Sequence, residues 1–566
     1  MKRIAAWLLC LALLLPMTVC AAAEQDCKPD KNVLYAALYE ADISSVQEAL
    51  RSGLITCEEL TRYYLERIEQ YNDPYNCFIT MCDDAQEVAR RRDEQLAQGK
   101  IEGLLFGIPV VIKDNMDLAG YHTTNGYKKE DGQIASANAD VVQYLLDEGA
   151  VIIGKTNMST GAQDALRSLS DAVGETKNAY NIYLASGGSS GGTAVAVSLN
   201  FATVGLGTDT NSSLRIPAAL NGCISLRPTF GLLSKNGIKK LNGTRDTAGA
   251  ITRTVYDQAV MMDVMTQGQY RYTENLDANA LQGMRIGVLK QLSYATTQTG
   301  LRSDANIDDE VAAVFENAIN ELRACGAEVV EVSMPKLFSL SDPTLKSNDQ
   351  ELKDALYAAF SQLQKTENVS AVIYPAYLST PIRSGVDADG NVWDVYQQTN
   401  INNCRAISPS ASVPEISVPI GNHSLGAGIS MEIAADKNQE QLLLNIAYAY
   451  TSRYNHRTVP TGAPNTYSAY DQGALRTVIA DYRQKLADLN KPTEATAPET
   501  TSPEITEAAE TLQNPQEQPG VQIWLLYVAA GVIVILVLAV IVPQIARKRR
   551  RRRRKMPVLT LKDPDD

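Results

Sequence analysis

The chain has 566 residues, a formal net charge of −13 and nine cysteines. Twelve of its 52 basic residues but only three of its 65 acidic residues lie in 1–23 and 543–566. The long central part is therefore strongly acidic, which argues against nucleic acid as its ligand. Seven cysteines follow residue 23. An odd number leaves at least one thiol free in an oxidising compartment, and both buried free thiols and a disulfide framework stay open for the others.

Residues 1–23 are predicted to be a secretory signal peptide. Two basic residues precede an apolar run at 4–15, and small residues follow just before Ala23, which is the order typical of a cleaved leader. A lipoprotein site at Cys20 fits less well, because Val19 is bulky where a small residue is expected. An uncleaved anchor also fits less well, because the apolar run is short for a bilayer span.

Residues 24–490 are predicted to form one large α/β domain, because no Pro- or Gly-rich linker interrupts them. Asp42 is expected to begin a helix, and Thr56 and Glu59 form a capping box at the start of the next helix. Three short apolar runs bounded by glycine favour buried strands, with helical patterns between them. The expected strands cover 109–112, 150–153 and 203–206, and an expected helix covers 139–148. Such alternation indicates a largely covered sheet.

Two serines in loops of small residues and one upstream lysine are the candidate catalytic groups. Ser189 lies within 186–192, which reads Ser-Gly-Gly-Ser-Ser-Gly-Gly, and Ser213 follows 24 positions later. Lys113 ends an apolar run that is expected to carry it into the core. A serine hydroxyl needs a base to become a good nucleophile, and burial lowers the pKa of a lysine far enough for it to serve as that base.

These motifs resemble the amidase signature family, whose hydrolases use a Ser–Ser–Lys triad. The resemblance implies a single domain with a mixed central β-sheet covered by helices. It also implies Ser213 as the nucleophile, Ser189 as a bridging serine after a cis peptide bond at Gly188, and Lys113 as the base. The resemblance further implies supporting roles for Ser190, Asp209 and Arg215, and an oxyanion hole made by the backbone N–H groups of Thr210, Asn211, Ser212 and Ser213.

The resemblance runs from about residue 42 to 263 and resumes from about 374 to 450. The middle, roughly 270–370, is not recognisable and is a candidate for substrate specificity. Two glycines usually precede the nucleophile in the family, whereas this chain has Asn211-Ser212. Glycine permits φ > 0, asparagine is among its best replacements, and serine is a less comfortable one. A weakened homologue that acts as a surface binding protein is therefore an alternative.

A second alternative is an α/β-hydrolase esterase that uses Ser189. Gly187-x-Ser189-x-Gly191 fits the nucleophile elbow of that class. Its chemistry would require His423 or His456 as the base and would leave the second serine loop without a role. The sequence shows no clustered histidines, cysteines and carboxylates that would hold a metal, and no cofactor is expected.

The C-terminal part is predicted to attach the domain to a membrane. Residues 491–520 are rich in Pro, Thr and Glu and are expected to form a disordered stalk. Residues 521–542 are apolar and long enough for a transmembrane helix. Nine consecutive basic residues within 543–566 predict a cytoplasmic tail, and a stop-transfer role explains them more simply than binding to nucleic acid.

The sequence therefore predicts a single-pass, membrane-anchored extracellular amidohydrolase. It is expected to cleave C–N bonds of small-molecule or peptide amides, with esters as a second class. An exported position argues against the amidotransferase branch of the family, which acts on charged tRNA in the cytosol.

Overall fold

The computed structural model describes part of the chain. It covers residues 27–489 except for 129–133, 295–307, 336, 338–349, 387–388, 396–397, 399–401 and 466–472. The chain divides into the units 1–491 and 492–566, and all described residues belong to the first. The predicted leader, stalk, membrane helix and basic tail lie outside the described residues. Among the described helices, none combines the length and the apolar character that crossing a membrane requires.

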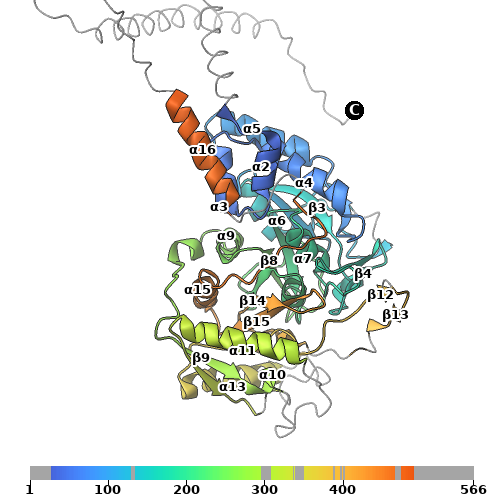
Figure 1. The fold of residues 1–566 in the computed structure, drawn as a ribbon. Coiled ribbons are helices and arrows are strands. Elements are labelled where there is room, and N and C mark those ends of the chain that lie inside the picture. The colour runs from blue at the N-terminus through green and yellow to red at the C-terminus, as the bar shows by residue number, and fades with distance from the viewer. Residues whose placement is uncertain are drawn as a thin grey trace, which may run out of the picture. The chain divides into compact units, whose positions relative to one another are not determined.

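A mixed sheet of eleven strands runs through the domain (Figure 1). In spatial order its strands are β1 (Phe78–Met81), β3 (Val151–Thr156), β2 (Pro109–Lys113), β6 (Val204–Asp209), β8 (Thr247–Thr252), β7 (Ile224–Arg227), β14 (Glu415–Asn422), β15 (Gly428–Ala434), β11 (Ala371–Pro375), β9 (Arg285–Leu289) and β10 (Glu328–Val332). β2 pairs in parallel with β3 and β6, and β9 with β10 and β11, whereas the other pairs are antiparallel. The expected α/β fold with a mixed sheet is confirmed.

The three strands expected from the sequence are neighbours in this sheet. β3, β2 and β6 are parallel, and every residue in them is buried. Strands covered on both faces read as continuous apolar runs, which is why the sequence revealed them. Because the carboxyl ends of parallel strands meet at one edge of a sheet, Lys113 and Asp209 end β2 and β6 at the same edge.

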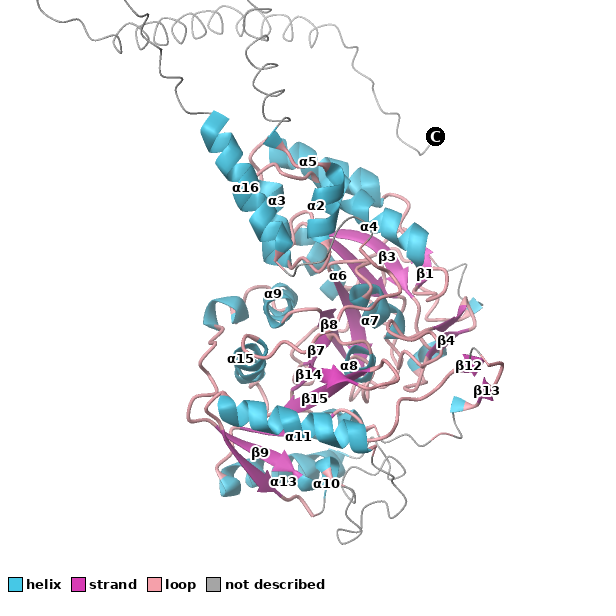
Figure 2. Ribbon diagram, viewed as in Figure 1, coloured by secondary structure: helices cyan, strands magenta, loops and turns pink. Residues whose placement is uncertain are grey.

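Helices lie on both sides of the strands (Figure 2). The α-helices are α2 (Lys31–Leu38), α3 (Ile43–Arg51), α4 (Cys57–Tyr71), α5 (Ala85–Ala97), α6 (Asp140–Asp147), α7 (Gly191–Ser198), α8 (Arg215–Leu220), α9 (Val255–Met265), α10 (Lys290–Ser293), α11 (Asp309–Ala324), α13 (Gln350–Glu367), α14 (Ser408–Ala411), α15 (Glu440–Thr451) and α16 (Ala474–Leu489). Short 3₁₀ turns are η2 (Thr160–Ala162), η3 (Tyr272–Asn275) and η6 (Asn403–Arg405), and small hairpins pair β4 (Ser168–Ser170) with β5 (Gly174–Thr176) and β12 (Gly385–Val386) with β13 (Val392–Trp393).

The expected helix starts are confirmed by their capping bonds. The Thr56 hydroxyl accepts from the backbone N–H of Glu59, and the Glu59 carboxylate accepts from that of Thr56, each at 3.0 Å. The Asp42 carboxylate accepts from the backbone N–H of Ser45 at 2.7 Å at the start of α3. These bonds satisfy N–H groups that a helix leaves without internal partners.

The first and last described helices lie side by side. α16 packs on α2 and α3 (Figure 1), and Arg476 pairs with the Asp42 carboxylate at 2.7 Å. All seven cysteines after residue 23 are free thiols, and all but Cys27 are buried. Of the two alternatives that the sequence left open, the structure shows free thiols.

The middle of the chain builds the far end of the sheet. β9, β10 and β11 lie there with α11 and α13 (Figure 1). A separate apolar core packs around this end, with Leu289, Leu356 and Phe360 fully buried in it. The region with unrecognised sequence is thus part of the same sheet.

Candidate active site

The bridging-serine loop approaches its neighbours with no space for a side chain at Gly188. A Cβ atom there would lie 2.3 Å from the Asp164 carbonyl oxygen and 2.5 Å from that of Arg167. Gly187 adopts φ of 75°, and the peptide bond between Gly188 and Ser189 is cis. The cis bond expected from the family resemblance is confirmed.

Lys113 and Ser189 are in direct contact. The Lys113 Nζ lies 2.6 Å from the Ser189 Oγ and 2.9 Å from the Thr208 Oγ1. The Lys113 side chain is fully buried. Burial lowers its pKa to about 7, against the opposing effect of the Asp209 and Asp246 carboxylates. A neutral amine is therefore accessible near neutral pH, next to a serine hydroxyl.

Ser213 lies on the loop that adjoins Ser189. The backbone N–H of Ser190 donates to the Ser213 carbonyl oxygen at 3.2 Å. The Ser190 Oγ donates to the Thr208 carbonyl oxygen at 3.2 Å, which ties the same residue to β6. Ser213 is 6% exposed, more than the fully buried Ser189. The expected group of Lys113, Ser189 and Ser213 thus lies on two serine loops joined through Ser190 and on the strand beside them.

The loop before α8 presents backbone donors with no acceptor. Within the described residues, none accepts a hydrogen bond from the backbone N–H of Asn211, Ser212 or Ser213. The Thr210 hydroxyl donates to the Asp246 carboxylate at 2.7 Å and fixes the start of this loop. Free N–H groups on one loop can donate to a developing oxyanion, so the geometry is compatible with the expected oxyanion hole.

The two residues that replace the family's glycines fit this backbone. Neither Asn211 nor Ser212 has a positive φ. The expectation that position 212 would be uncomfortable for serine is therefore wrong, because the backbone here does not enter the region that favours glycine. The departure from the family's pattern changes the side chains and does not strain the loop.

Buried charges brace the loop from below. Arg215 holds the Asp209 carboxylate through its Nε at 3.1 Å, and its Nη2 donates to the Asn211 carbonyl oxygen at 2.8 Å. Arg227 contacts the same carboxylate at 3.2 Å. Burial alone would raise the pKa of Asp209, but the two guanidinium groups hold it below its ordinary value. Arg227 is itself fully buried.

Two glutamates complete this buried network. Arg215 Nη1 lies 2.5 Å from a Glu415 carboxylate oxygen and 3.7 Å from one of Glu432. Burial and the neighbouring Glu415 raise the pKa of Glu432 well above its ordinary value. The Arg215 guanidinium therefore faces three buried acidic side chains, those of Asp209, Glu415 and Glu432.

Sequence reasoning missed several polar residues beside the lysine. Thr208 bonds to Lys113 and also accepts from the Asn115 side-chain amide at 3.0 Å. A second buried lysine, Lys155, pairs with Asp114 at 3.1 Å and holds the end of β2. Thr208 directly precedes Asp209 at the end of β6, in the second serine motif. Its position on that strand was the signal that could have identified it. The pairing of Lys155 with Asp114 had no local signal.

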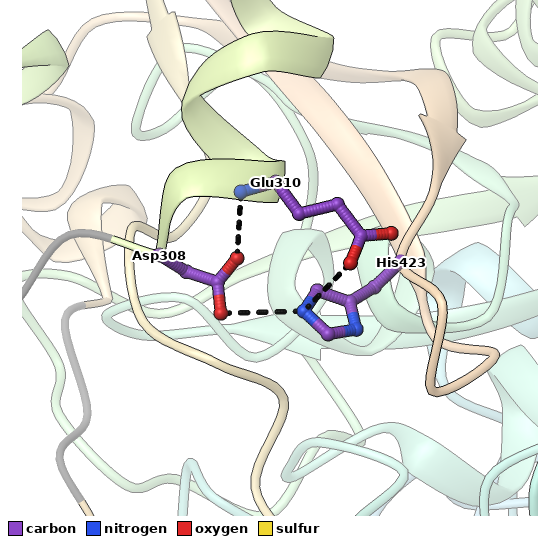
Figure 3. A group of neighbouring side chains, drawn as sticks. All are labelled: Asp308, Glu310 and His423. Carbon is purple, nitrogen blue, oxygen red and sulfur yellow. Dashed lines mark hydrogen bonds and ion pairs between the residues drawn. The ribbon is translucent and has the colours of Figure 1, made fainter.

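The histidines are engaged elsewhere. His423 Nε2 lies between two carboxylates, 3.3 Å from Asp308 and 3.5 Å from Glu310 (Figure 3). Its Nδ1 accepts from the backbone N–H of Leu425 at 3.0 Å. His456 Nε2 lies 2.8 Å from the Glu321 carboxylate. No hydrogen bond joins Ser189 to a histidine within the described residues, all three histidines included, so the geometry gives the elbow alternative no base.

Folding also forms clusters of metal-ligating residue types that the sequence did not show. Asp308, Glu310 and His423 form one, and Cys404, Glu415 and Glu432 form the other. In the first, Nδ1 accepts a backbone hydrogen, so the ring proton lies on Nε2 and occupies the atom that would ligate a metal. Asp308 also caps α11 through the Glu310 and Val311 backbone. This cluster fastens the β14–β15 turn to the start of α11.

Two hollows flank the loop that carries Ser213. One, of about 140 Å³, is lined by Thr208, Thr210 and Asp246 together with Lys235 and Lys239. The other, of about 560 Å³, is lined by Asn211 and by the segment that includes Gln163, Asp164 and Arg167. Thr210 and Asn211, at the start of this loop, thus each line a hollow.

Solved structures with this fold include amidases. The native peptide amidase from Stenotrophomonas maltophilia superposes with a TM-score of 0.63 at 27% identity, over 75% of this chain and 99% of that chain. An amidase family protein from Bacillus anthracis str. Ames gives a TM-score of 0.62 at 23% identity, over 78% and 97% of the two chains. The second similarity concerns the fold alone.

The Amidase family model matches residues 59–347, just over half of the chain. The chain therefore belongs to the Amidase family, and the assignment made from its three motifs is confirmed. A curated relative, a glutamyl-tRNA(Gln) amidotransferase subunit from Caldanaerobacter subterraneus subsp. tengcongensis, is 34% identical over 310 residues, which are 53% of this chain and 61% of that protein. The chain thus spans about three fifths of the length of the curated relatives it matches.

Proposed function

We propose that this protein hydrolyses carboxamide C–N bonds through an acyl-enzyme on Ser213. The observation that carries the proposal is the buried Lys113, whose Nζ lies 2.6 Å from the Ser189 Oγ and whose pKa burial lowers to about 7. A base with a pKa near the working pH is the most effective one for proton transfer. Membership of the Amidase family and the peptide amidase of similar structure support the same chemistry.

In the proposed reaction, the Ser213 Oγ attacks the carbonyl carbon and gives its proton to the Ser189 Oγ. Ser189 in turn passes its own proton to neutral Lys113. The carbonyl oxygen becomes an oxyanion that accepts from the free N–H groups of the loop. The intermediate then collapses, the C–N bond breaks, and the amine leaves with a proton returned through Ser189. Water then attacks the acyl ester and gives a proton through Ser189 to Lys113. The carboxylic acid leaves as that proton returns to the Ser213 Oγ.

We propose small-molecule or peptide amides as substrates, with esters as a second class. The peptide amidase, which is 27% identical, shares the fold over 99% of its length. We further propose that the reaction takes place outside the cytoplasm, on a domain held by one C-terminal membrane helix. The support comes from the leader at 1–23, the apolar segment at 521–542 and the basic run after it.

Labelling with a fluorophosphonate probe tests the proposed chemistry, because the probe reacts only with an activated serine. The full chain, Ser213→Ala, Ser189→Ala and a double His423→Gln/His456→Gln variant are labelled, and the modified residue is mapped by mass spectrometry. We expect the adduct on Ser213 in the wild type and in the histidine variant, and none in Ser213→Ala. An adduct on Ser189 that needs the histidines would support the esterase alternative, and no adduct on folded protein would support the binding-protein alternative.

Location is tested separately by treating intact cells with protease. We expect the proposed catalytic domain to be degraded from outside and a fragment containing residues 521–566 to stay with the membrane fraction after alkaline washing. A domain protected in intact cells and released by cell lysis would contradict the proposed location while leaving the chemistry untouched.

A further inference from the structure

The two side chains that replace the family's glycines are each held by a partner from another part of the chain. Arg245 Nη1 donates to the Asn211 Oδ1 at 3.0 Å. The Asn402 side-chain amide donates to the Ser212 Oγ at 3.0 Å. The partners stand 34 and 190 positions away in sequence. Consecutive residues of one loop are thus tied on two sides.

Arg245 is available for this role because its charge has no counter-ion within the described part of the chain. Among those residues, no carboxylate lies within ion-pair distance of its guanidinium, and its side chain is half-buried. Its backbone carbonyl accepts from Arg227 at 2.7 Å, and Arg227 belongs to the buried network around Asp209. The Arg245 backbone is therefore held in place by Arg227, and its side chain extends from this fixed position to the loop.

Asn402 approaches the loop from a distant segment of the chain. It forms an isolated β-bridge with Tyr377 and is 5% exposed. Its Oδ1 is buried without a partner among the described residues, so its amide N–H₂ is the part of the side chain that is engaged. Ser212 itself is fully buried, and its hydroxyl therefore depends on partners inside the protein.

We propose that Arg245 and Asn402 are positioning residues that hold the backbone N–H groups of Asn211, Ser212 and Ser213 in place for the oxyanion. This inference rests on the proposed function. The donors of an oxyanion hole act only at about 2.7–3.1 Å from the oxygen, so small shifts of their loop weaken them. In this chain, two side-chain tethers stand where the family usually has glycine, and both act through the two residues that precede Ser213.

Double-mutant cycles on the full chain test the proposal. Arg245→Met and Asn402→Ala are each expected to lower the second-order labelling rate of Ser213 about tenfold, the size of one net hydrogen bond. Asn211→Gly and Ser212→Ala remove the other end of each tether and are expected to do the same. Within each pair, the double variant is expected to be no slower than the slower single variant. If Asn402→Ala does not fold, Ser212→Ala alone still removes the second tether, and its labelling rate tests that tether.

The readout must separate positioning from general stability. Rates are taken per folded molecule, with folding followed by circular dichroism, and an amide substrate is used to separate kcat from KM. Positioning predicts a lower kcat with KM unchanged. Arg453→Met and Asn445→Ala, which change the same residue types away from the loop, serve as matched controls and are expected to label at the wild-type rate.

Effects that multiply to about a hundredfold within a pair would overturn the proposal, as would a wild-type rate in folded Arg245→Met and Asn402→Ala. A raised KM at constant kcat would also overturn it and assign these residues to substrate binding. In each of these cases the wild type still labels at Ser213, and the proposed function stands. A folded wild type that does not label would contradict the proposed function and this inference together.

Discussion

Two regions of the eleven-stranded sheet are built on different physical principles. The middle of the sheet, with β2, β6 and β7, buries charged groups, among them Lys113, Asp209, Arg215 and Arg227, all fully inside the protein. The end with β9–β11 buries hydrocarbon side chains such as those of Leu289, Leu356 and Phe360. Buried charges contribute little net stability and are held in place for other reasons. The comparison indicates that the middle of the sheet is organised for chemistry and the end with β9–β11 for stability.

The largest expected effect concerns the middle of the sheet, where the charged groups are buried. Lys113→Met should lower the labelling rate of Ser213 by about 10²- to 10⁴-fold, because it removes the general base. Stability should stay the same or rise, because an apolar side chain replaces a buried amine. Urea unfolding alongside the labelling rate measures both. A loss of rate that only follows a loss of folded protein would contradict the catalytic role.

The next effect concerns the buried network below the loop. Arg215→Met leaves the Asp209 and Glu415 carboxylates without their shared cation, and should lower the free energy of unfolding by about 4 kcal/mol. Arg271→Met is the matched control, since its pair with Glu274 is exposed, and should change it by less than about 1 kcal/mol. Equal losses of unfolding free energy in the two variants, measured by urea unfolding, would contradict the large contribution expected from the buried network.

A smaller effect is expected at the apolar end. Leu356→Ala on α13 should lower the free energy of unfolding by about 3 kcal/mol through lost burial and a cavity. The labelling rate per folded molecule should not change. Leu489→Ala is the control, because Leu489 is 44% exposed, and should change stability by less than about 0.5 kcal/mol. A slower labelling rate in folded Leu356→Ala would show that packing at the apolar end affects Ser213 in the middle of the sheet.

The sequence predicted the middle of the sheet and its serine loops well, because the signals for them are local. The apolar runs that became β2, β3 and β6, the capping box at Thr56 and the small-residue loops around Ser189 all lie within a few residues of the features they indicate. The cis peptide bond was implied by the family resemblance. The positions of Lys113, Ser189 and Ser213 followed from three motifs in order.

The rest was beyond local reasoning because it depends on contacts between distant segments. Asn402 reaches Ser212 across 190 positions, and Lys155 reaches Asp114 across parallel strands. The far end of the sheet was not recognised because β9 and β10 lie in the part of the chain, roughly 270–370, that carries no recognisable motif. The φ angles at Asn211 and Ser212 could not be read from residue types, and glycine in relatives wrongly suggested a left-handed backbone.

The pH dependence of Ser213 labelling tests the central claim most directly, that a buried lysine activates the serines. Because burial places the Lys113 pKa at about 7, the rate should rise about tenfold per pH unit below 7 and level off above it. The unfolded chain binds the lysine proton more tightly, so the contribution of Lys113 to stability should rise with pH from about 7 up to the usual lysine pKa. Lys113→Met should lose both dependences. A wild-type rate that is flat across this range, or a profile that persists in Lys113→Met, would contradict the account.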